Sequence, residues 1–142
     1  MVERKSRFTV AQQLDSKKAD GVAEAIKTML TPYKKNCYTL TFDNGKEFAH
    51  HEDIAQALDT SVYFAHPYHS WERGLNENTN GLIRQYFPKK TNLRKVTQSE
   101  VQLAIHKLNH RPRKCLGYRT PHEVLFSLKV KPLKSIAVAL RI

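Results

Sequence analysis

With 142 residues, the chain is long enough for one modest domain and too short for two domains with separate cores. Its two cysteines form no C-x-x-C pair and no apolar run approaches a membrane span, which disfavours a disulfide framework, a zinc ribbon and a membrane protein, and fits the cytoplasm. Lys and Arg number 24 against 13 Asp and Glu, and this formal charge of +11 favours nucleic acid as the partner.

The N-terminal part of the sequence shows a strand pattern followed by a helix pattern. A polar turn at Arg4 to Arg7 precedes Phe8 to Leu14, where alternation and β-branched residues predict a short strand. Apolar residues at helical spacing predict a helix over Lys17 to Leu30, which we expect Thr31-Pro32 to end.

Two further strand patterns follow, separated by a short helix. β-branched and aromatic residues predict a strand at Tyr38 to Phe42 that ends abruptly at Asp43-Asn44-Gly45. The pattern predicts a short helix over His51 to Leu58 and another strand over Ser61 to Phe64. This alternation of strands and helices indicates an α/β sheet domain.

Helix patterns occupy the rest of the sequence. One helix is predicted over Leu75 to Phe87. Thr97-x-x-Glu100 has the form of a capping box and opens a second helix that runs to about Leu108. Thr120-Pro121 starts a third, which runs to about Leu128. We therefore expect a helical C-terminal extension to the sheet domain.

Two acidic residues are placed where they could bind a metal ion together. Asp43 follows a hydrophobic strand directly, and Glu77 stands on the first turn of a long helix. Enzymes of phosphoryl transfer use such carboxylates because Mg²⁺ and Mn²⁺ are hard cations that prefer oxygen ligands. Asp-Asn-Gly is also a common turn signal, and a helix dipole favours Glu in a first turn, so ordinary structural roles are the alternative.

The segments around these acids resemble a known family. Residues 41–48 read TFDNGKEF, residues 66–88 read HPYHSWERGLNENTNGLIRQYFP, residues 108–114 read LNHRPRK and residues 116–121 read LGYRTP. These segments are similar to bacterial insertion-sequence transposases of the family of insertion element thirty, over about Val2 to Phe126. The resemblance implies the DDE class, with a ribonuclease-H-like, retroviral-integrase-like mixed sheet and flanking helices.

The resemblance also implies roles for individual residues. Asp43 corresponds to the second catalytic acid and Glu77 to the third, both as ligands of Mg²⁺ or Mn²⁺. The 33 residues between them match the spacing of the family. Glu72 is the nearest rival, but only 28 residues separate it from Asp43.

Basic residues are candidates for contacts with DNA. Arg84 stands seven positions after Glu77, where the family carries a basic residue, and helical geometry places both on the face away from Leu82, Ile83 and Tyr86. The other candidates lie in two basic stretches: Lys89, Lys90, Arg94, Lys95, Arg111, Arg113, Lys114 and Arg119. Solvated helix ends are the alternative explanation for these charges.

A few other residues could bind ligands, although ordinary roles explain them better. The histidines His50, His51, His66 and His69 could in principle bind zinc, but they lack cysteine partners at ligand spacing. Trp71 could stack on an exposed base, while a lone tryptophan in a loop is more often a packing anchor.

The activity implied by the resemblance is attack by water, and then by a DNA 3′ hydroxyl, on a phosphodiester. Its partners would be the ends of the insertion element and target DNA, in a homo-oligomer or an assembly with intact transposase near the nucleoid.

The resemblance also implies that part of the core is missing. The family's first Asp lies on the central first strand of a 3-2-1-4-5 sheet, which here would fall before Met1. We therefore expect a partial core at 1–88, a basic helical extension at 89–128 and a tail at 129–142, inactive alone. The alternative is a non-catalytic basic DNA-binding remnant of a decayed insertion element.

Overall fold

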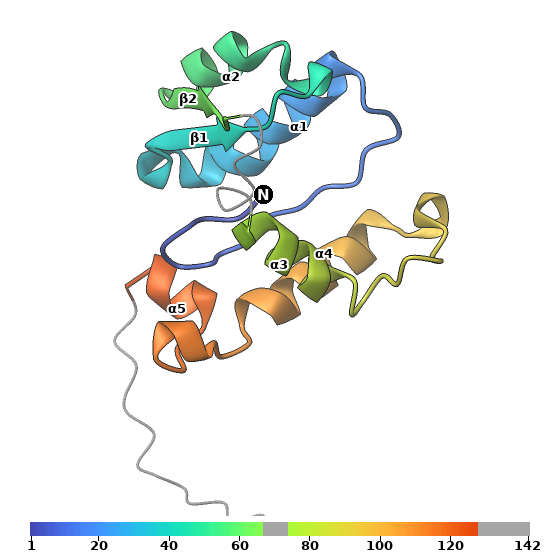
Figure 1. Ribbon diagram of the computed structural model, residues 1–142, viewed down its shortest axis with the longest axis vertical. Coiled ribbons are helices and arrows are strands. Elements are labelled where there is room, and N and C mark those ends of the chain that lie inside the picture. The colour runs from blue at the N-terminus through green and yellow to red at the C-terminus, as the bar shows by residue number, and fades with distance from the viewer. Residues whose placement is uncertain (67–73, 128–142) are drawn as a thin grey trace, which may run out of the picture.

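The computed structural model describes residues 1–66 and 74–127, and Figure 1 shows a sheet part and a helical layer with the N-terminal segment between them. The sheet part contains α1 (Ala19–Leu30), the 3-10 helix η1 (Thr31–Asn36), β1 (Thr39–Phe42), η2 (Lys46–Phe48), α2 (His51–Leu58) and β2 (Ser61–Phe64). The helical layer contains α3 (Gly74–Ile83), η4 (Leu93–Lys95), α4 (Gln98–Asn109), η5 (Lys114–Leu116) and α5 (Pro121–Leu125). Expectations for His69, Trp71, Glu72, Leu128 and the tail fall outside the described residues.

The two strands form a small parallel sheet. β1 pairs with β2 in a register that runs from Thr39 opposite Ser61 to Phe42 opposite Phe64. α2 provides the crossover that parallel strands require, because a tight turn cannot return the chain to the same end of the sheet. The loops that follow β1 and β2 therefore begin at the same edge.

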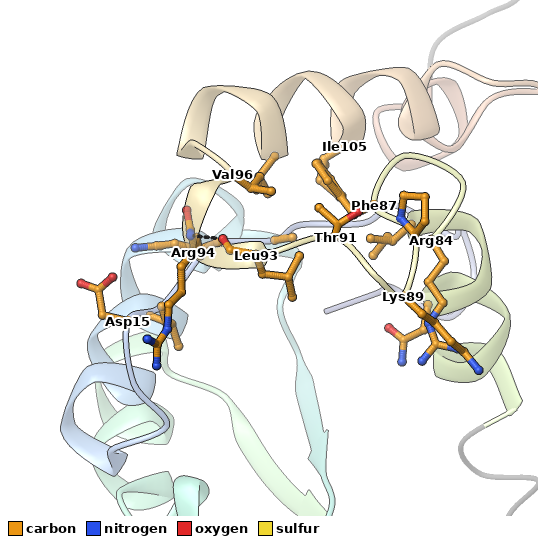
Figure 2. Close-up of a pocket in the computed structure, with 17 residues that line it drawn as sticks. Asp15, Arg84, Phe87, Lys89, Thr91, Leu93, Arg94, Val96 and Ile105 are labelled. Carbon is orange, nitrogen blue, oxygen red and sulfur yellow. Dashed lines mark hydrogen bonds between the residues drawn. The ribbon is translucent and has the colours of Figure 1, made fainter.

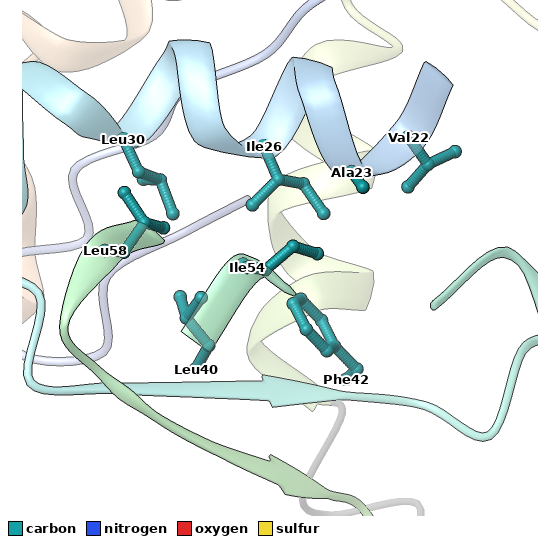
Figure 3. Close-up of a cluster of buried hydrophobic side chains, with 8 residues drawn as sticks. All are labelled: Val22, Ala23, Ile26, Leu30, Leu40, Phe42, Ile54 and Leu58. Atoms are coloured by element: carbon teal, nitrogen blue, oxygen red, sulfur yellow. The ribbon is translucent and has the colours of Figure 1, made fainter. Parts of the chain in front are cut away.

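One hydrophobic core joins both helices of the sheet part to β1 (Figure 3). Its buried members are Val22, Ala23, Ile26 and Leu30 of α1, Leu40 and Phe42 of β1, and Ile54 and Leu58 of α2. Alternate residues of β1 face this core because successive side chains of a strand point to opposite faces. Burial of Phe42 thus anchors the residue immediately before Asp43.

Several predicted elements are confirmed. The helix predicted over His51 to Leu58 and the strand over Ser61 to Phe64 have the predicted bounds. The helix predicted over Lys17 to Leu30 begins later, at Ala19, and ends at Leu30 as predicted, where Thr31 and Pro32 start the 3-10 helix η1. The capping box of Thr97 and Glu100 is present at the start of α4.

The strand predicted over Phe8 to Leu14 is not formed. Only Thr9 of this segment makes a β-bridge, an isolated antiparallel bridge with Val2 across the predicted polar turn. Arg7 closes that turn in the left-handed conformation, with φ 63°. The segment is extended but has no neighbouring strand among the described residues to continue the ladder.

Side chains of α4 take the place of that missing neighbour. Three amides on α4, which we call the α4 amide row, hydrogen-bond the extended segment: Gln98, Gln102 and Asn109. Asn109 accepts from the Thr9 N–H at 2.9 Å and donates to the Thr9 carbonyl at 2.8 Å. Gln102 donates to the Ala11 carbonyl at 3.0 Å, and Gln98 accepts from the Gln13 N–H at 2.9 Å. The two buried backbone groups of Thr9 are thereby satisfied without a sheet.

α3 is shorter than predicted. It ends at Ile83 rather than Phe87, and the following residues form a tighter turn in which the Tyr86 N–H donates to the Ile83 carbonyl at 3.0 Å. Pro88 keeps the helix from continuing past this turn, because a proline disfavours the helical conformation in the residue before it, here Phe87.

Within the described residues, no helix is long and apolar enough to cross a membrane.

Candidate active site

Asp43 begins the turn that follows β1 at the edge of the sheet. The Gly45 N–H donates to Asp43 Oδ1 over 3.3 Å, so the carboxylate is held near its own backbone. The Asn44 side chain donates to the Ala65 carbonyl at 3.2 Å, and the Ala65 N–H donates to the Phe42 carbonyl at 2.8 Å. The turn that carries Asp43 is therefore tied to the end of β2.

Aromatic contacts hold the far side of this turn. The rings of Phe42 and Phe48 are stacked, with centroids 4.4 Å apart and planes inclined by 5°. The ring of His51 meets Phe64 edge-on at 5.0 Å, and His51 Nδ1 lies 3.3 Å from the Phe48 carbonyl oxygen. The residues on either side of the 43–47 turn, Phe42 and Phe48, are therefore packed against each other and hold the two ends of the turn in place.

Glu77 lies in the first turn of α3 and is exposed. The predicted faces of this segment are confirmed: Glu77, Gly81 and Arg84 are exposed, whereas Leu82, Ile83 and Tyr86 are partly buried. Thr79 is the buried residue of the helix, at 8% exposure, and its hydroxyl donates to the Leu75 carbonyl at 2.8 Å. The inward side of α3 is therefore anchored while Glu77 faces outward.

Within the described part of the chain, neither carboxylate forms an ion pair with a cation. Across residues 1–66 and 74–127, the ion pairs join Glu24 to Lys27 and His50 to two aspartates, and none includes Asp43 or Glu77. In the same part of the chain, no three His, Cys, Asp or Glu side chains form a group that could hold a metal ion. The donor chemistry of the two exposed carboxylates fits a hard divalent cation, as part of a larger ligand set.

Glu47 is a further acidic residue at this turn, and sequence reasoning missed it. Its carboxylate folds back on Gly45: a Cβ on this glycine would lie 2.5 Å from Glu47 Oε2 and 2.9 Å from Oε1. Because the Gly45 N–H also donates to Asp43, one glycine contacts both carboxyl groups. The signal in the sequence is a glutamate two residues after the Asp-Asn-Gly turn.

Three exposed basic residues line a cavity between the N-terminal segment, the end of α3, the loop after it and α4. The cavity measures about 810 Å³ and is lined by both apolar and polar residues. Figure 2 shows Arg84 and Lys89 on one side of the cavity and Arg94 on the other. Lys90 and Lys95 are exposed on the same loop. Five of the predicted DNA-binding residues therefore lie close together along the chain and open to solvent.

Two other predicted DNA-binding arginines are engaged inside the fold. Arg113 is half-buried and its Nη2 donates to the Leu108 carbonyl at 3.1 Å, while Arg119 Nη2 donates to the Glu123 carbonyl at 3.0 Å. Burial, followed by the nearby positive charge of Arg111, holds the pKa of the Arg113 guanidinium below its ordinary value. These contacts give both arginines a part in holding the helical layer.

Arg111 and Lys114 remain exposed at the same end of the layer. Arg111 Nη1 donates to Gln85 Oε1 at 3.0 Å and so links the end of α4 to the turn after α3. Lys114 begins η5 and is open to solvent. The basic extension therefore combines solvent-facing and internally bonded cations.

The histidines proposed as zinc ligands have other contacts. His50 Nε2 lies 2.9 Å from Asp20, and its Nδ1 lies 3.6 Å from Asp53. His51 packs on Phe64, as described above. These contacts join α1 to α2 and support the ordinary structural interpretation.

Comparison with other sequences shows what kind of protein the chain is similar to. No protein-family model matches the chain. The chain is 54% identical over 112 residues to the transposase for insertion sequence element IS4351 of Bacteroides fragilis, covering 79% of this chain and 34% of that protein. It is 45% identical over 127 residues to transposase InsI for insertion sequence element IS30A of Escherichia coli (strain K12), covering 88% and 33%. Its relatives at 45–54% identity over most of the chain are insertion-sequence transposases of the family of insertion element thirty.

A more distant relative extends the match along the chain. The transposase for insertion sequence element IS1086 of Cupriavidus metallidurans (strain CH34) is 36% identical over 142 residues, covering 97% of this chain and 41% of that protein. The chain thus spans about a third to two fifths of the length of these transposases. The match therefore covers only one part of each of these transposases.

Solved structures confirm the predicted fold class. The catalytic core domain of BIV integrase superposes with a TM-score of 0.70 at 24% identity, over 89% of this chain and 82% of that one. The simian T-cell lymphotropic virus intasome, in complex with PP2A regulatory subunit B56 gamma, gives 0.66 at 20% identity, over 99% and 52%. The fold is therefore the ribonuclease-H-like fold of retroviral integrase cores.

Proposed function

We propose that the chain contributes two of the three acids of a DDE transposase site, Asp43 and Glu77, to phosphodiester hydrolysis and strand transfer on DNA. The carrying observation is that two exposed carboxylates with the family spacing lie at the end of β1 and at the start of α3. The similarity to insertion-sequence transposases and the integrase-like fold support this assignment.

A divalent metal ion fits the proposed site, with Mg²⁺ or Mn²⁺ as the candidates. Asp43 and Glu77 offer oxygen ligands, and the turn through Asn44 and Gly45 fixes where the first of them stands. When bound, such an ion supplies charge neutralisation at the phosphodiester and activation of the attacking oxygen. The side chains themselves serve to hold and orient, which is the principal task of a protein in phosphoryl transfer.

DNA is the proposed substrate and partner. The exposed cations Arg84, Lys89, Lys90, Arg94, Lys95, Arg111 and Lys114 are suited to phosphate contacts, which position the duplex without reading its sequence. Arg113 and Arg119 are proposed to act mainly through the fold, since both donate to backbone carbonyls. Assembly with further copies of a transposase is part of the same proposal.

A second candidate function is non-catalytic binding of DNA. The formal charge of +11 favours it, because counterion release from phosphates does not depend on a metal site. This candidate predicts salt-sensitive binding to duplex DNA that Asp43→Asn and Glu77→Gln leave unchanged, without any nicking.

The decisive experiment is a nicking and strand-transfer assay with Mg²⁺ or Mn²⁺ on DNA that carries element ends. The full chain is tested both alone and joined to an Asp-bearing upstream strand of the family. We expect nicking that Asp43→Asn and Glu77→Gln each abolish, while Glu52→Gln, an exposed glutamate of α2, retains it. Unchanged nicking in either of the first two variants would refute the site assignment.

A further inference from the structure

The turn after β1 carries Glu47 in an unusual setting for a carboxylate. Glu47 is only half-exposed, and it has no hydrogen-bond or ion-pair partner among the residues that the structure describes. Its oxygens can therefore accept hydrogen bonds from groups outside the described chain. The water shell of a bound cation would supply such donors.

The Glu47 carboxylate lies against the same glycine that hydrogen-bonds Asp43. Its two oxygens lie against Gly45, at 2.5 and 2.9 Å from where a Cβ would stand, and the N–H of this glycine donates to Asp43. Any side chain at residue 45 would displace the Glu47 carboxylate. The turn therefore combines a glycine with a carboxylate folded back over it.

Neighbouring contacts hold Glu47 in this place. It lies in η2, whose Phe48 stacks on Phe42 at 4.4 Å and donates its N–H to the Gly45 carbonyl at 3.1 Å. The loop is thus closed on both sides of Glu47. Preorganisation of this kind matters for metal sites, because groups around the direct ligands orient them and tune the ion.

We propose that Glu47 is a positioning residue for the metal ion: its carboxylate accepts hydrogen bonds from water molecules bound to the divalent ion that Asp43 holds. Mg²⁺ favours such an arrangement, because it gives up its hydration shell reluctantly and keeps several waters when bound to proteins. The inference rests on the proposed metal site and gives Glu47 a part outside the set of direct ligands. Glu47 acts through the waters of the ion and does not replace Glu77.

A purely structural role for Glu47 makes different predictions. In that case its charge serves the first turn of η2, or its side chain merely covers Gly45. Glu47→Gln keeps the size of the side chain and removes the charge. A structural role would appear as a change in thermal stability without metal, whereas a metal-positioning role appears as a change in metal affinity.

The test is calorimetric titration with Mn²⁺ alone. It uses whichever form binds Mn²⁺, the full chain alone or the full chain joined to the Asp-bearing upstream strand. We expect Glu47→Gln to weaken Mn²⁺ binding about tenfold, as loss of groups around direct ligands does. The melting temperature in the absence of metal should stay unchanged. Glu52→Gln is the matched control, because Glu52 is an exposed glutamate on the neighbouring α2 and should leave both quantities unchanged.

A second variant tests the position of the carboxylate rather than its charge. Gly45 has φ −72°, which alanine also adopts, so Gly45→Ala adds only a methyl group where the Glu47 carboxylate now lies. We expect Gly45→Ala to weaken Mn²⁺ binding as well. In the double variant Gly45→Ala/Glu47→Gln, the loss should not exceed that of Glu47→Gln by much, because both changes remove the same interaction.

The outcomes separate this inference from the proposed function. If Asp43→Asn abolishes Mn²⁺ binding while Glu47→Gln leaves it unchanged, the role of Glu47 is refuted and the metal site stands. If Mn²⁺ binding survives Asp43→Asn, the metal site itself is refuted. Additive losses in the double variant would also overturn the inference, because Gly45 and Glu47 would then act separately.

Discussion

Thr97 and Glu100 cap α4 reciprocally: Glu100 Oε2 accepts the Thr97 N–H at 2.7 Å, and Thr97 Oγ1 accepts the Glu100 N–H at 3.3 Å. The bond from the Thr97 N–H, and then that from its hydroxyl, hold the pKa of Glu100 below its ordinary value of 4.5. A lowered pKa in the folded state means that the stabilisation is complete above the ordinary pKa. It is lost as pH falls through the lower, folded-state pKa.

The first prediction is therefore that Glu100→Gln flattens the acid side of the stability profile. Wild-type protein should lose more stability than the variant between about pH 5 and about pH 3, because only the wild type has this carboxylate to protonate. Urea unfolding across this range measures the difference. Glu52→Gln serves as the control, and equal acid sensitivity in wild type and Glu100→Gln would contradict the prediction.

The second prediction concerns the bond between Asn109 and Thr9. Both residues are buried, at 4% and 3% exposure, and Asn109→Ala would leave the N–H and the carbonyl of Thr9 without their partner. An unsatisfied buried polar group costs about 1–3 kcal/mol, so we expect a loss of about 2–4 kcal/mol. Chemical unfolding measures it.

Gln102→Ala is the matched control for Asn109→Ala. Gln102 lies in the same α4 amide row but is exposed and makes one bond, to the Ala11 carbonyl. Its loss should cost about 0.5–1.5 kcal/mol, because water can replace it. Equal effects of the two substitutions would mean that the buried amide has no special part in holding the N-terminal segment.

The third prediction tests the basic residues that line the cavity between α3 and α4. Arg84→Gln and Lys89→Gln should each weaken binding to duplex DNA, and each should reduce the slope of log K against log salt by about one if it removes a phosphate contact. Fluorescence anisotropy over a salt series measures both effects. Lys35→Gln, an exposed lysine of η1 in the sheet part, should change neither. An identical slope for all three variants would place the DNA elsewhere.

Local patterns predicted the local features well. The bounds of α2 and β2, the Thr97 cap and the outward face of Glu77 and Arg84 depend on neighbours within one turn of helix or one strand. Spacing and side-chain chemistry record such neighbours directly. The family resemblance then assigned Asp43 and Glu77 their proposed roles, which periodicity alone left open against turn and dipole explanations.

Features that depend on distant or folded-back contacts could not be predicted in this way. Phe8 to Leu14 has the alternation of a strand, but its backbone partners are amides of α4, which stand 85 to 100 positions later in the sequence. No local sequence pattern around Arg113 indicates that its guanidinium donates to the Leu108 carbonyl. Likewise, the closeness of Glu47 to Gly45 arises from the short η2 helix.

The separation of 100 residues between Thr9 and Asn109 has a consequence for synthesis of the protein. A ribosome that adds about 5–20 residues per second makes Asn109 on the order of 5–20 s after Thr9. β1, α2 and β2 lie within residues 39–64, so all of their mutual contacts become available much sooner. Thr9 therefore leaves the ribosome well before its partner on α4 does, and until Asn109 is made it remains open to chaperones and proteases.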